Sequence, residues 1–314
     1  MIGLVSRKLA RAALTLWLVV TFTFVILRVT GDPALAILPT DSPPEVLAHF
    51  RSEWGLDRSL WQQYALYFVN VAKGNLGISF IDNRDAVTVV LEKVPKTLWL
   101  GIPSLLLMLA IGFPAGIAAA LRRDGPLDRA IMTAAVLAHS IPSFVLGILL
   151  IGIFAVRLRM LPTSGSDSWQ HLVLPMVTLG ASGAAVIARF IRSSMLEILG
   201  QPYVRAAVAK GVPWPRVVRG HALPNAAIPT VTVIGFLVGG LVAGAVIVES
   251  VFAWPGVGRL LVTSVSNRDL AVVQTILLLV AATMVTANCV IDLLYGWLDP
   301  RLRAEGQGSA RGGH

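Results

Sequence analysis

The side chains that most often carry out catalysis or bind metals are few and scattered in this sequence. The 314 residues include one cysteine, Cys289, and five histidines, namely His49, His139, His171, His221 and His314. A protein metal site needs several such ligands at close and regular spacing, but the sequence holds no H-E-x-x-H motif and no cysteine pair. We therefore expect no catalytic residue and no metal site, and we interpret Cys289 as a small apolar residue packed within a helix.

A glycine-rich run, Pro255–Arg259, comes nearest to a phosphate-binding loop. Such a loop needs the pattern G-x4-G-K-[ST], in which the lysine reaches the phosphates, and the sequence contains no Gly-Lys pair. We interpret the run as a turn. The chain itself is expected to bind no nucleotide and no other cofactor.

The most distinctive segment is basic and runs over residues 203–224. Tyr203–Ala209 favours a helix, Gly211 is suited to a left-handed turn that ends it, and a second short helix is predicted from Pro215 to Leu223, ending before Pro224. The physical pattern leaves two interpretations open. The segment is either a basic hairpin lying on anionic lipid or a surface on which another protein docks.

The elements that position this segment are predicted to cross a membrane. Hydrophobic residues make up 55% of the chain and charged residues only 14%, whereas soluble domains carry about 25% charged residues. Six apolar segments approach the roughly 20 residues that a helix needs to cross a bilayer. They are Ala12–Val29, Leu98–Leu121, Ala130–Val156, Leu172–Ala188, Ala226–Val248 and Ala271–Leu294. The first could instead be a cleaved signal peptide, but its length and the interruption at Arg28 and Asp32 favour a retained helix.

The distribution of basic residues predicts the orientation. Lysine and arginine gather at the N-terminus, after the second span, between the fourth and fifth spans and in the tail, which places these parts in the cytoplasm. Residues 30–97 then form a long external segment, with a helix predicted near Ser59–Ala72. The net charge of +9 is explained by these loops and does not indicate nucleic-acid binding.

Polar groups inside the predicted spans are sparse. Because the middles of the spans hold no ionisable side chain, a proton or ion relay is poorly supported, and the energy for any transport has to come from elsewhere. A self-sufficient six-span carrier or channel remains the alternative from another class. In the fifth span, Gly235, Gly239, Gly240 and Gly244 predict close packing against neighbouring helices.

The basic segment resembles a known loop. The spacing Ala206-Ala207-x3-Gly211-x9-His221-x-Leu223-Pro224 is similar to the E-A-A-x3-G-x9-I-x-L-P loop of the permease subunits of ATP-binding-cassette (ABC) importers. Arg205 stands in place of the acidic residue and His221 in place of isoleucine, departures similar to those of the peptide/nickel branch. The resemblance implies a coupling helix that inserts into a groove of the ATPase subunit, and it favours docking over lipid binding. The docking residues it implies are Arg205, Ala206, Ala207, Gly211, His221, Leu223 and Pro224.

Further motifs of that branch follow in order along the chain. They are Gly31-Asp32-Pro33, Gly55-Leu56-Asp57, Gly74-Asn75-Leu76-Gly77-x-Ser79-Phe80, Thr97-Leu98, Glu249-x2-Phe252-x-Trp254-Pro255-Gly256-x-Gly258-Arg259, Asn267-Arg268-Asp269 and Asp292-x2-Tyr295-x3-Asp299-Pro300-Arg301. Together they are far more specific than any one alone. The set after the fifth span predicts an external cap near the solute pathway, formed by Glu249, Phe252, Trp254, Pro255, Gly256 and Gly258.

The resemblance implies an all-α integral membrane protein of the bacterial inner membrane, with both termini in the cytoplasm. Residues 1–93 are expected to form the first span and the external segment, 94–295 a type-1 permease domain and 296–314 a cytoplasmic tail. The implied function is import of dipeptides, oligopeptides or related solutes, with nickel, glutathione and oligosaccharides as alternatives. The implied partners are a second permease subunit in a heterodimer with this "B"-type member, two ATPase subunits that bind the ATP, an extracytoplasmic solute-binding protein and membrane lipid.

Overall fold

A computed structural model describes residues 2–29, 42–53, 57–79 and 81–298. Within these ranges the chain is helical, and its one β feature is an isolated antiparallel bridge between Ile78 and Asp85. Four predicted features fall wholly or partly outside the described residues, namely Gly31-Asp32-Pro33, Gly55-Leu56, Phe80 and the tail from Asp299. The division at residues 93 and 295 stays a prediction.

The chain forms two compact units, Met1–Pro95 with Arg259–Val285, and Lys96–Gly258 with Thr286–His314. The first holds α1 (Ile2–Val29), α3 (Pro44–Glu53), α4 (Leu60–Ala72), α5 (Ala86–Leu91), most of α13 (Val257–Ser266) and the first part of α14 (Leu270–Leu298). The second holds most of α6 (Val94–Leu121), α7 (Pro126–Ser140), α8 (Ser143–Leu150), the π-helix η1 (Ile151–Arg157) and α9 (Trp169–Leu199). It continues with α10 (Pro202–Ala209), α11 (Trp214–Val217), the π-helix η2 (Val218–Ala222) and α12 (Leu223–Val251).

Among the described residues, three helices are long and apolar enough to cross a membrane, Ala86–Leu121, Trp169–Leu199 and Leu270–Ala287. Two bent pairs bring the number to five if each pair is a single span. The predicted first span appears as a shorter apolar helix, Ala13–Ile26. The predicted membrane class is therefore supported, and the count of six spans stays a prediction.

The predicted span Ala130–Val156 is sharply bent. Helices α7 and α8–η1 meet at an angle of 99°. The break lies at Ile141, whose ψ of 120° is extended and which precedes Pro142. A proline ring disfavours the helical conformation of the residue before it, so the helix ends at Ser140 and restarts after the proline.

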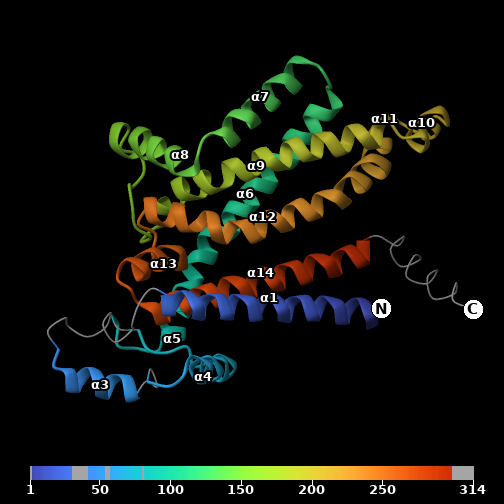
Figure 1. The fold of residues 1–314 in the computed structure, drawn as a ribbon. Helices are drawn as coiled ribbons and strands as arrows, with labels where there is room; N and C mark the ends of the chain where they lie inside the picture. The colour runs from blue at the N-terminus through green and yellow to red at the C-terminus, as the bar shows by residue number, and fades with distance from the viewer. Residues whose placement is uncertain (1, 30–41, 54–56, 80, 299–314) are drawn as a thin grey trace, which may run out of the picture. The chain divides into compact units, whose positions relative to one another are not determined.

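Helix α9 is the centre of the second unit. In Figure 1 it lies between α7 and α12, and it contacts both. Within its most apolar 18-residue window 56% of residues are buried, against 33% for the span ending at Leu121. The core around it includes Leu179, Ile187, Ile191 and Met195. The predicted span Leu172–Ala188 is the weakest of the six, because it is short and contains Pro175, Gly180 and Gly183. It nevertheless lies in the most buried of the three long apolar helices.

Close approach of α6 and α9 depends on glycines on α6. A Cβ atom at Gly112 would lie 2.7 Å from Ile187 Cβ, and one at Gly116 would lie 2.6 Å from the Ala188 carbonyl oxygen. By contrast, a Cβ at Gly240 would meet no atom within 4 Å. Within this chain, the small-residue spacing that brings two helices together is therefore Gly112-x3-Gly116, which was not predicted, and close packing at Gly240 stays a prediction.

In the first unit, two motifs distant in sequence meet. The buried Ser79 hydroxyl donates to Asp269 Oδ2, and a Cβ at Gly77 would lie 3.3 Å from Ala271 Cβ. Asp269 also caps α14, because its Oδ1 accepts a hydrogen bond from the Val272 N–H at 3.4 Å. The Gly-rich external motif is thereby held at the start of the last long helix.

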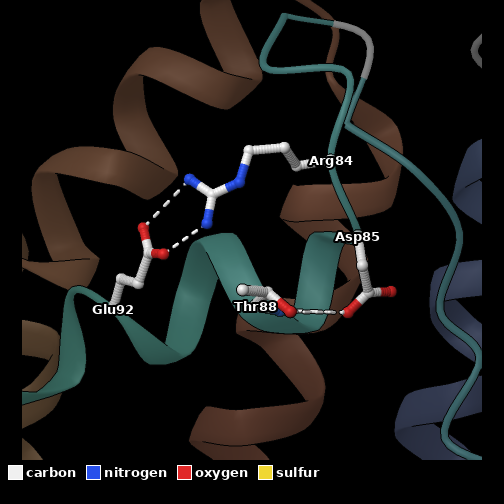
Figure 2. A network of polar contacts seen from close by, with 4 residues as sticks. All are labelled: Arg84, Asp85, Thr88 and Glu92. Atoms are coloured by element: carbon white, nitrogen blue, oxygen red, sulfur yellow. Dashed lines mark hydrogen bonds and ion pairs between the residues drawn. The ribbon is translucent and has the colours of Figure 1, made fainter.

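Polar side chains fix both ends of the short helix α5 (Figure 2). Asp85 accepts from the Thr88 N–H at 3.1 Å and so caps the first turn. Arg84 and Glu92 face each other along one side of the helix as a forked ion pair, in which Nη1 donates to Oε2 at 3.2 Å. Both side chains are about half exposed, so the pair orients the turn before α5 and contributes little free energy.

The predicted helix near Ser59–Ala72 is confirmed as α4. Ser59 and Gln62 form a capping box at its start. The helix ends in a left-handed turn at Gly74, where the N–H groups of Gly74 and Asn75 donate to the carbonyls of Val71 and Asn70.

Candidate functional site

The candidate docking segment, residues 202–224, turns back on itself at Gly211. The predicted helix is confirmed as α10, and Gly211 has the predicted left-handed conformation, with φ 76°. The Gly211 N–H donates to the Val208 carbonyl at 2.9 Å and the Val212 N–H to the Ala207 carbonyl at 3.2 Å. These bonds form a Schellman motif, in which glycine avoids the strain that a Cβ would bring at positive φ.

Apolar side chains anchor this segment to the core of the second unit. Val204, Val217 and Ala222 are buried, and Val218 and Ala222 belong to the core cluster around α9. The segment is thus a fixed projection of the helical body. Any force applied to it acts directly on α9 and α12, which it joins.

The outer surface of the docking segment combines exposed apolar and basic residues. Tyr203, Val208 and Trp214 are each close to half exposed, although they lie among charged neighbours. The basic residues are Arg205, Lys210, Arg216 and Arg219, all exposed. Exposed apolar side chains with a cationic rim are typical of a surface that meets another protein.

The structure places the seven predicted docking residues along this one segment. Ala206, Gly211, His221 and Pro224 are exposed, and Ala207 and Leu223 are half-buried. Arg205 is exposed as well, but its guanidinium donates to the Gly200 carbonyl at 2.9 Å, so it braces the start of α10.

The predicted end of the second short helix before Pro224 is wrong. Helical backbone continues from α11 through the π-helix η2 into α12, with Pro224 in the first turn of α12. In an α-helix the N–H of residue 224 would donate to Gly220, but proline has no N–H. The Leu223 N–H instead donates to the Val218 carbonyl, a π-type bond that lets the chain pass the proline without a break.

Two of the six predicted external-cap residues, Glu249 and Trp254, form a compact cluster with Lys96, Thr97 and Val257, and we call these five residues the clasp. The Thr97 hydroxyl donates to Glu249 Oε1 and accepts from the Val257 N–H, both at 2.8 Å. The Trp254 indole N–H donates to the Lys96 carbonyl at 2.8 Å. Glu249 is 0% exposed and Trp254 1% exposed. The clasp thus ties the start of α6 to the end of α12 through part-buried hydrogen bonds.

The two glycines of the Pro255–Arg259 run are explained by the space around them. A side chain at Gly256 would overlap the Glu249 carboxylate, and a Cβ at Gly258 would lie 2.5 Å from Val246 Cα. Pro255 is half-buried and Phe252 is buried. The prediction of a turn is therefore wrong for most of this run, because only Pro255 and Gly256 lie outside helix and Val257, Gly258 and Arg259 form the first turn of α13. Its glycines serve close packing.

Two long-range interactions in the second unit could not be predicted from the sequence. The first is the hydrogen bond from Thr97 to Glu249, for which the residues around Thr97 give no local signal. Asp128 and Arg192 form a bidentate ion pair, with both N–O distances 2.6 Å, between the start of α7 and the C-terminal half of α9. Their separation of 64 residues leaves no local signal.

Comparison with known proteins agrees with this architecture. Residues 112–304 match the family described as binding-protein-dependent transport system inner membrane component. Residues 1–101 match the N-terminal region described for the membrane component of such systems.

Curated relatives cover nearly the whole chain. The glutathione transport system permease protein GsiC of Escherichia coli strain K12 is 42% identical over 304 residues, which is 96% of this chain and 99% of that protein. GsiC of Shigella boydii serotype 4 strain Sb227 is 41% identical over the same share of both chains.

Among solved structures, a chain of the MetNI methionine ABC transporter in inward-facing conformations has a TM-score of 0.58 at 23% identity, covering 67% of this chain and 96% of that one. At this identity the likeness shows the fold alone. The profile matches, the similarity to GsiC and the fold together show that this chain belongs to the binding-protein-dependent transport system inner membrane components and is an ABC importer permease of the peptide/nickel branch.

Proposed function

We propose that this permease imports peptides and peptide-like solutes, glutathione included, through the bacterial inner membrane, with ATP hydrolysed by separate subunits. It pairs with a second, different permease subunit, of which it is the "B"-type partner. Two ATPase subunits bind on the cytoplasmic side and a solute-binding protein delivers solute from outside. The chain crosses the membrane six times and both termini lie in the cytoplasm.

The docking segment supports the ATPase interface most directly. A tight left-handed turn at Gly211 presents small residues and three exposed apolar side chains, while buried valines fix the segment to the core. A rigid projection of this kind transmits closure of the ATPase subunits as a rocking of the helices. Arg205, Ala206, Ala207, Gly211, His221, Leu223 and Pro224 are its proposed contact residues.

Two further features support the rest of the proposal. The relatives are named as glutathione permeases, and glutathione is a tripeptide, so it falls within the peptide class. The clasp residues and their neighbours, Phe252, Pro255, Gly256 and Gly258, are proposed to cap the external end of the pathway. The buried bonding of Glu249 suits a rigid cap and provides no free charge for an ion relay.

A pair of substitutions at Gly211 tests the docking assignment. Space around its Cβ position is open, so Gly211→Val and Gly211→Asn both fit sterically, but valine is strongly disfavoured at φ 76° and asparagine tolerates it. We expect Gly211→Val to uncouple ATP hydrolysis from uptake while the protein still inserts, and Gly211→Asn to retain most coupling. Solute-stimulated ATPase activity and uptake are measured in proteoliposomes of the purified complex.

Normal coupled transport by Gly211→Val would contradict the docking role of this turn. Uptake by the purified chain with no ATPase subunit present would contradict the whole proposal.

A further inference from the structure

Helix α4 is unlike a helix that lies in water. Residues 59–72 contain no charged side chain, whereas Asp57 and Arg58 precede them and Lys73 follows. A surface helix of a soluble domain carries charged residues on the face that meets water. The polar residues of α4, Gln62, Gln63 and Asn70, are all uncharged, so the helix lacks such a charged face.

The described residues of this chain leave one face of α4 exposed. Trp61 is 82% exposed, and Leu60, Leu66 and Val69 are exposed as well. The opposite face packs on α1. Tyr64 and Thr21 share a hydrogen bond at 2.7 Å, and the Phe24 ring lies 5.3 Å from the Tyr64 ring and 5.5 Å from the Tyr67 ring. Burial on this inner face raises the pKa of the Tyr67 phenol, because desolvation disfavours the phenolate.

The position of Thr21 and Phe24 along α1 indicates how deep in the membrane α4 lies. Phe24 and Thr21 lie five and eight residues before Val29, where α1 ends. At 1.5 Å per residue they are about 8 and 12 Å below the end of the helix. Interfacial helices bury their apolar face about 5–10 Å into the boundary of headgroups and acyl chains. Figure 1 shows α1 along its length and α4 nearly end-on, so α4 crosses α1 steeply.

The outer face of α4 also carries a shallow, open depression, which is lined by Arg58, Gln62, Ala65, Leu66 and Val69. A guanidinium at one end followed by apolar side chains matches a phospholipid, whose phosphate accepts hydrogen bonds from arginine and whose acyl chain packs on the apolar residues. Lys73 supplies a second cation at the other end of the helix.

We propose that α4 lies in the outer leaflet of the membrane, across the external end of α1, with Trp61, Leu66 and Val69 against phospholipid acyl chains and Arg58 at the headgroups. This inference rests on the proposed topology. It revises the expectation that residues 30–97 are wholly external, and it gives the external segment a fixed base on the bilayer.

The test uses fluorescent labels at single cysteines in a Cys289→Ser background, in the full complex reconstituted in phospholipid nanodiscs. Trp61→Cys and Leu66→Cys report on the outer face of α4. Asp82→Cys, in an exposed external turn, is the aqueous control, and Leu106→Cys, exposed on α6, is the control for a span. Quenching by a shallow doxyl-labelled phospholipid is compared with quenching by aqueous iodide.

We expect lipid quenching at residues 61 and 66 to exceed that at residue 82 severalfold, with iodide quenching in the reverse order. Iodide quenching equal to that at residue 82 would overturn the proposal and leave α4 facing water. Protection from both quenchers would also overturn it and indicate a covering protein, such as the second permease. Iodide quenching at residue 106 as strong as that at residue 82 would instead refute the proposed topology, so the two failures are distinguishable.

Discussion

At Thr97, one hydroxyl group joins two parts of the chain that lie 152 residues apart. It donates to the buried carboxylate of Glu249 and accepts from the Val257 N–H, so both roles of the hydroxyl are used. A buried carboxylate that loses a donor keeps the full cost of its desolvation. Loss of this one hydroxyl is therefore expected to destabilise the folded protein.

We expect Thr97→Val to lower the free energy of unfolding by about 1–3 kcal/mol, because valine keeps the shape but removes both hydrogen bonds. Thr97→Ser retains the hydroxyl and is the matched control, expected to stay close to the wild type. The thermal unfolding midpoint of the detergent-solubilised complex measures both. Equal midpoints for the two variants would show that the clasp does not depend on this hydroxyl.

Other residues take unusual backbone conformations because helices end there. Ala253 and Arg268 have φ values of 49° and 58°, the region that favours glycine. Each follows a helix whose last carbonyls accept the Schellman bonds, Trp254 N–H to Glu249 and Asp269 N–H to Ser264, both at 2.8 Å. The turn at Ala253 leads the chain into the clasp, and the turn at Arg268 leads it into the cap of α14. Both residues are therefore held in a backbone conformation that is strained for a residue with a Cβ.

At the scale of elements, the distance between α6 and α9 depends on how closely their two backbones can approach each other. Gly112 and Gly116 lie one helical turn apart and face Ile187, Ala188 and Ile191. In lipid, helices gain no hydrophobic free energy from meeting, so close van der Waals packing through small residues is the main attraction.

We expect Gly116→Ala to destabilise the protein by about 1–3 kcal/mol, because its Cβ would lie 2.6 Å from the Ala188 carbonyl oxygen and the helices must separate. Gly101→Ala on the same helix is the control, since its Cβ would meet no atom within 4 Å. Thermal unfolding of the complex separates the two. A midpoint for Gly116→Ala as high as that for Gly101→Ala would contradict the packing described for α6 and α9.

At the scale of the whole molecule, α9 connects α7, α12 and the docking segment within the second unit. It packs on α7 and α12, contributes Ile191 and Met195 to the core that holds the docking segment, and binds Asp128 through Arg192. Exposed apolar side chains remain on the long helices, including Leu106 on α6 and Phe236 on α12. Lipid and a second permease subunit are the proposed partners of these faces.

We expect the chain purified through an affinity tag from its native host to carry one copy of a different permease and two ATPase subunits, because the docking segment on each permease would hold one ATPase. Native mass spectrometry of the detergent-solubilised complex gives the copy numbers. Two copies of this chain in one complex would contradict the heterodimer, and a stable single chain that transports solute would support a self-sufficient carrier.

Local chemistry made several features predictable from the sequence alone. Hydropathy identified a membrane protein, because apolar helices are the structures that satisfy their backbone in lipid. Gly211 and the prolines around it predicted the turn of the docking segment, because the preferences that govern such turns lie within a few residues. The ordered motifs also identified the importer family, because each motif is a short run of neighbouring residues that can be read directly from the sequence.

Only the tertiary structure decided which residues distant in sequence contact one another. Thr97 bonds Glu249 across 152 residues, Ser79 bonds Asp269 across 190 and Asp128 pairs with Arg192 across 64. It also decided that the predicted span at Ala130–Val156 is bent and that the weakest predicted span is the central helix. Hydropathy measures how well a segment suits lipid, whereas a central helix suits its protein neighbours, so its small and polar residues weaken the signal by which a sequence reveals a span.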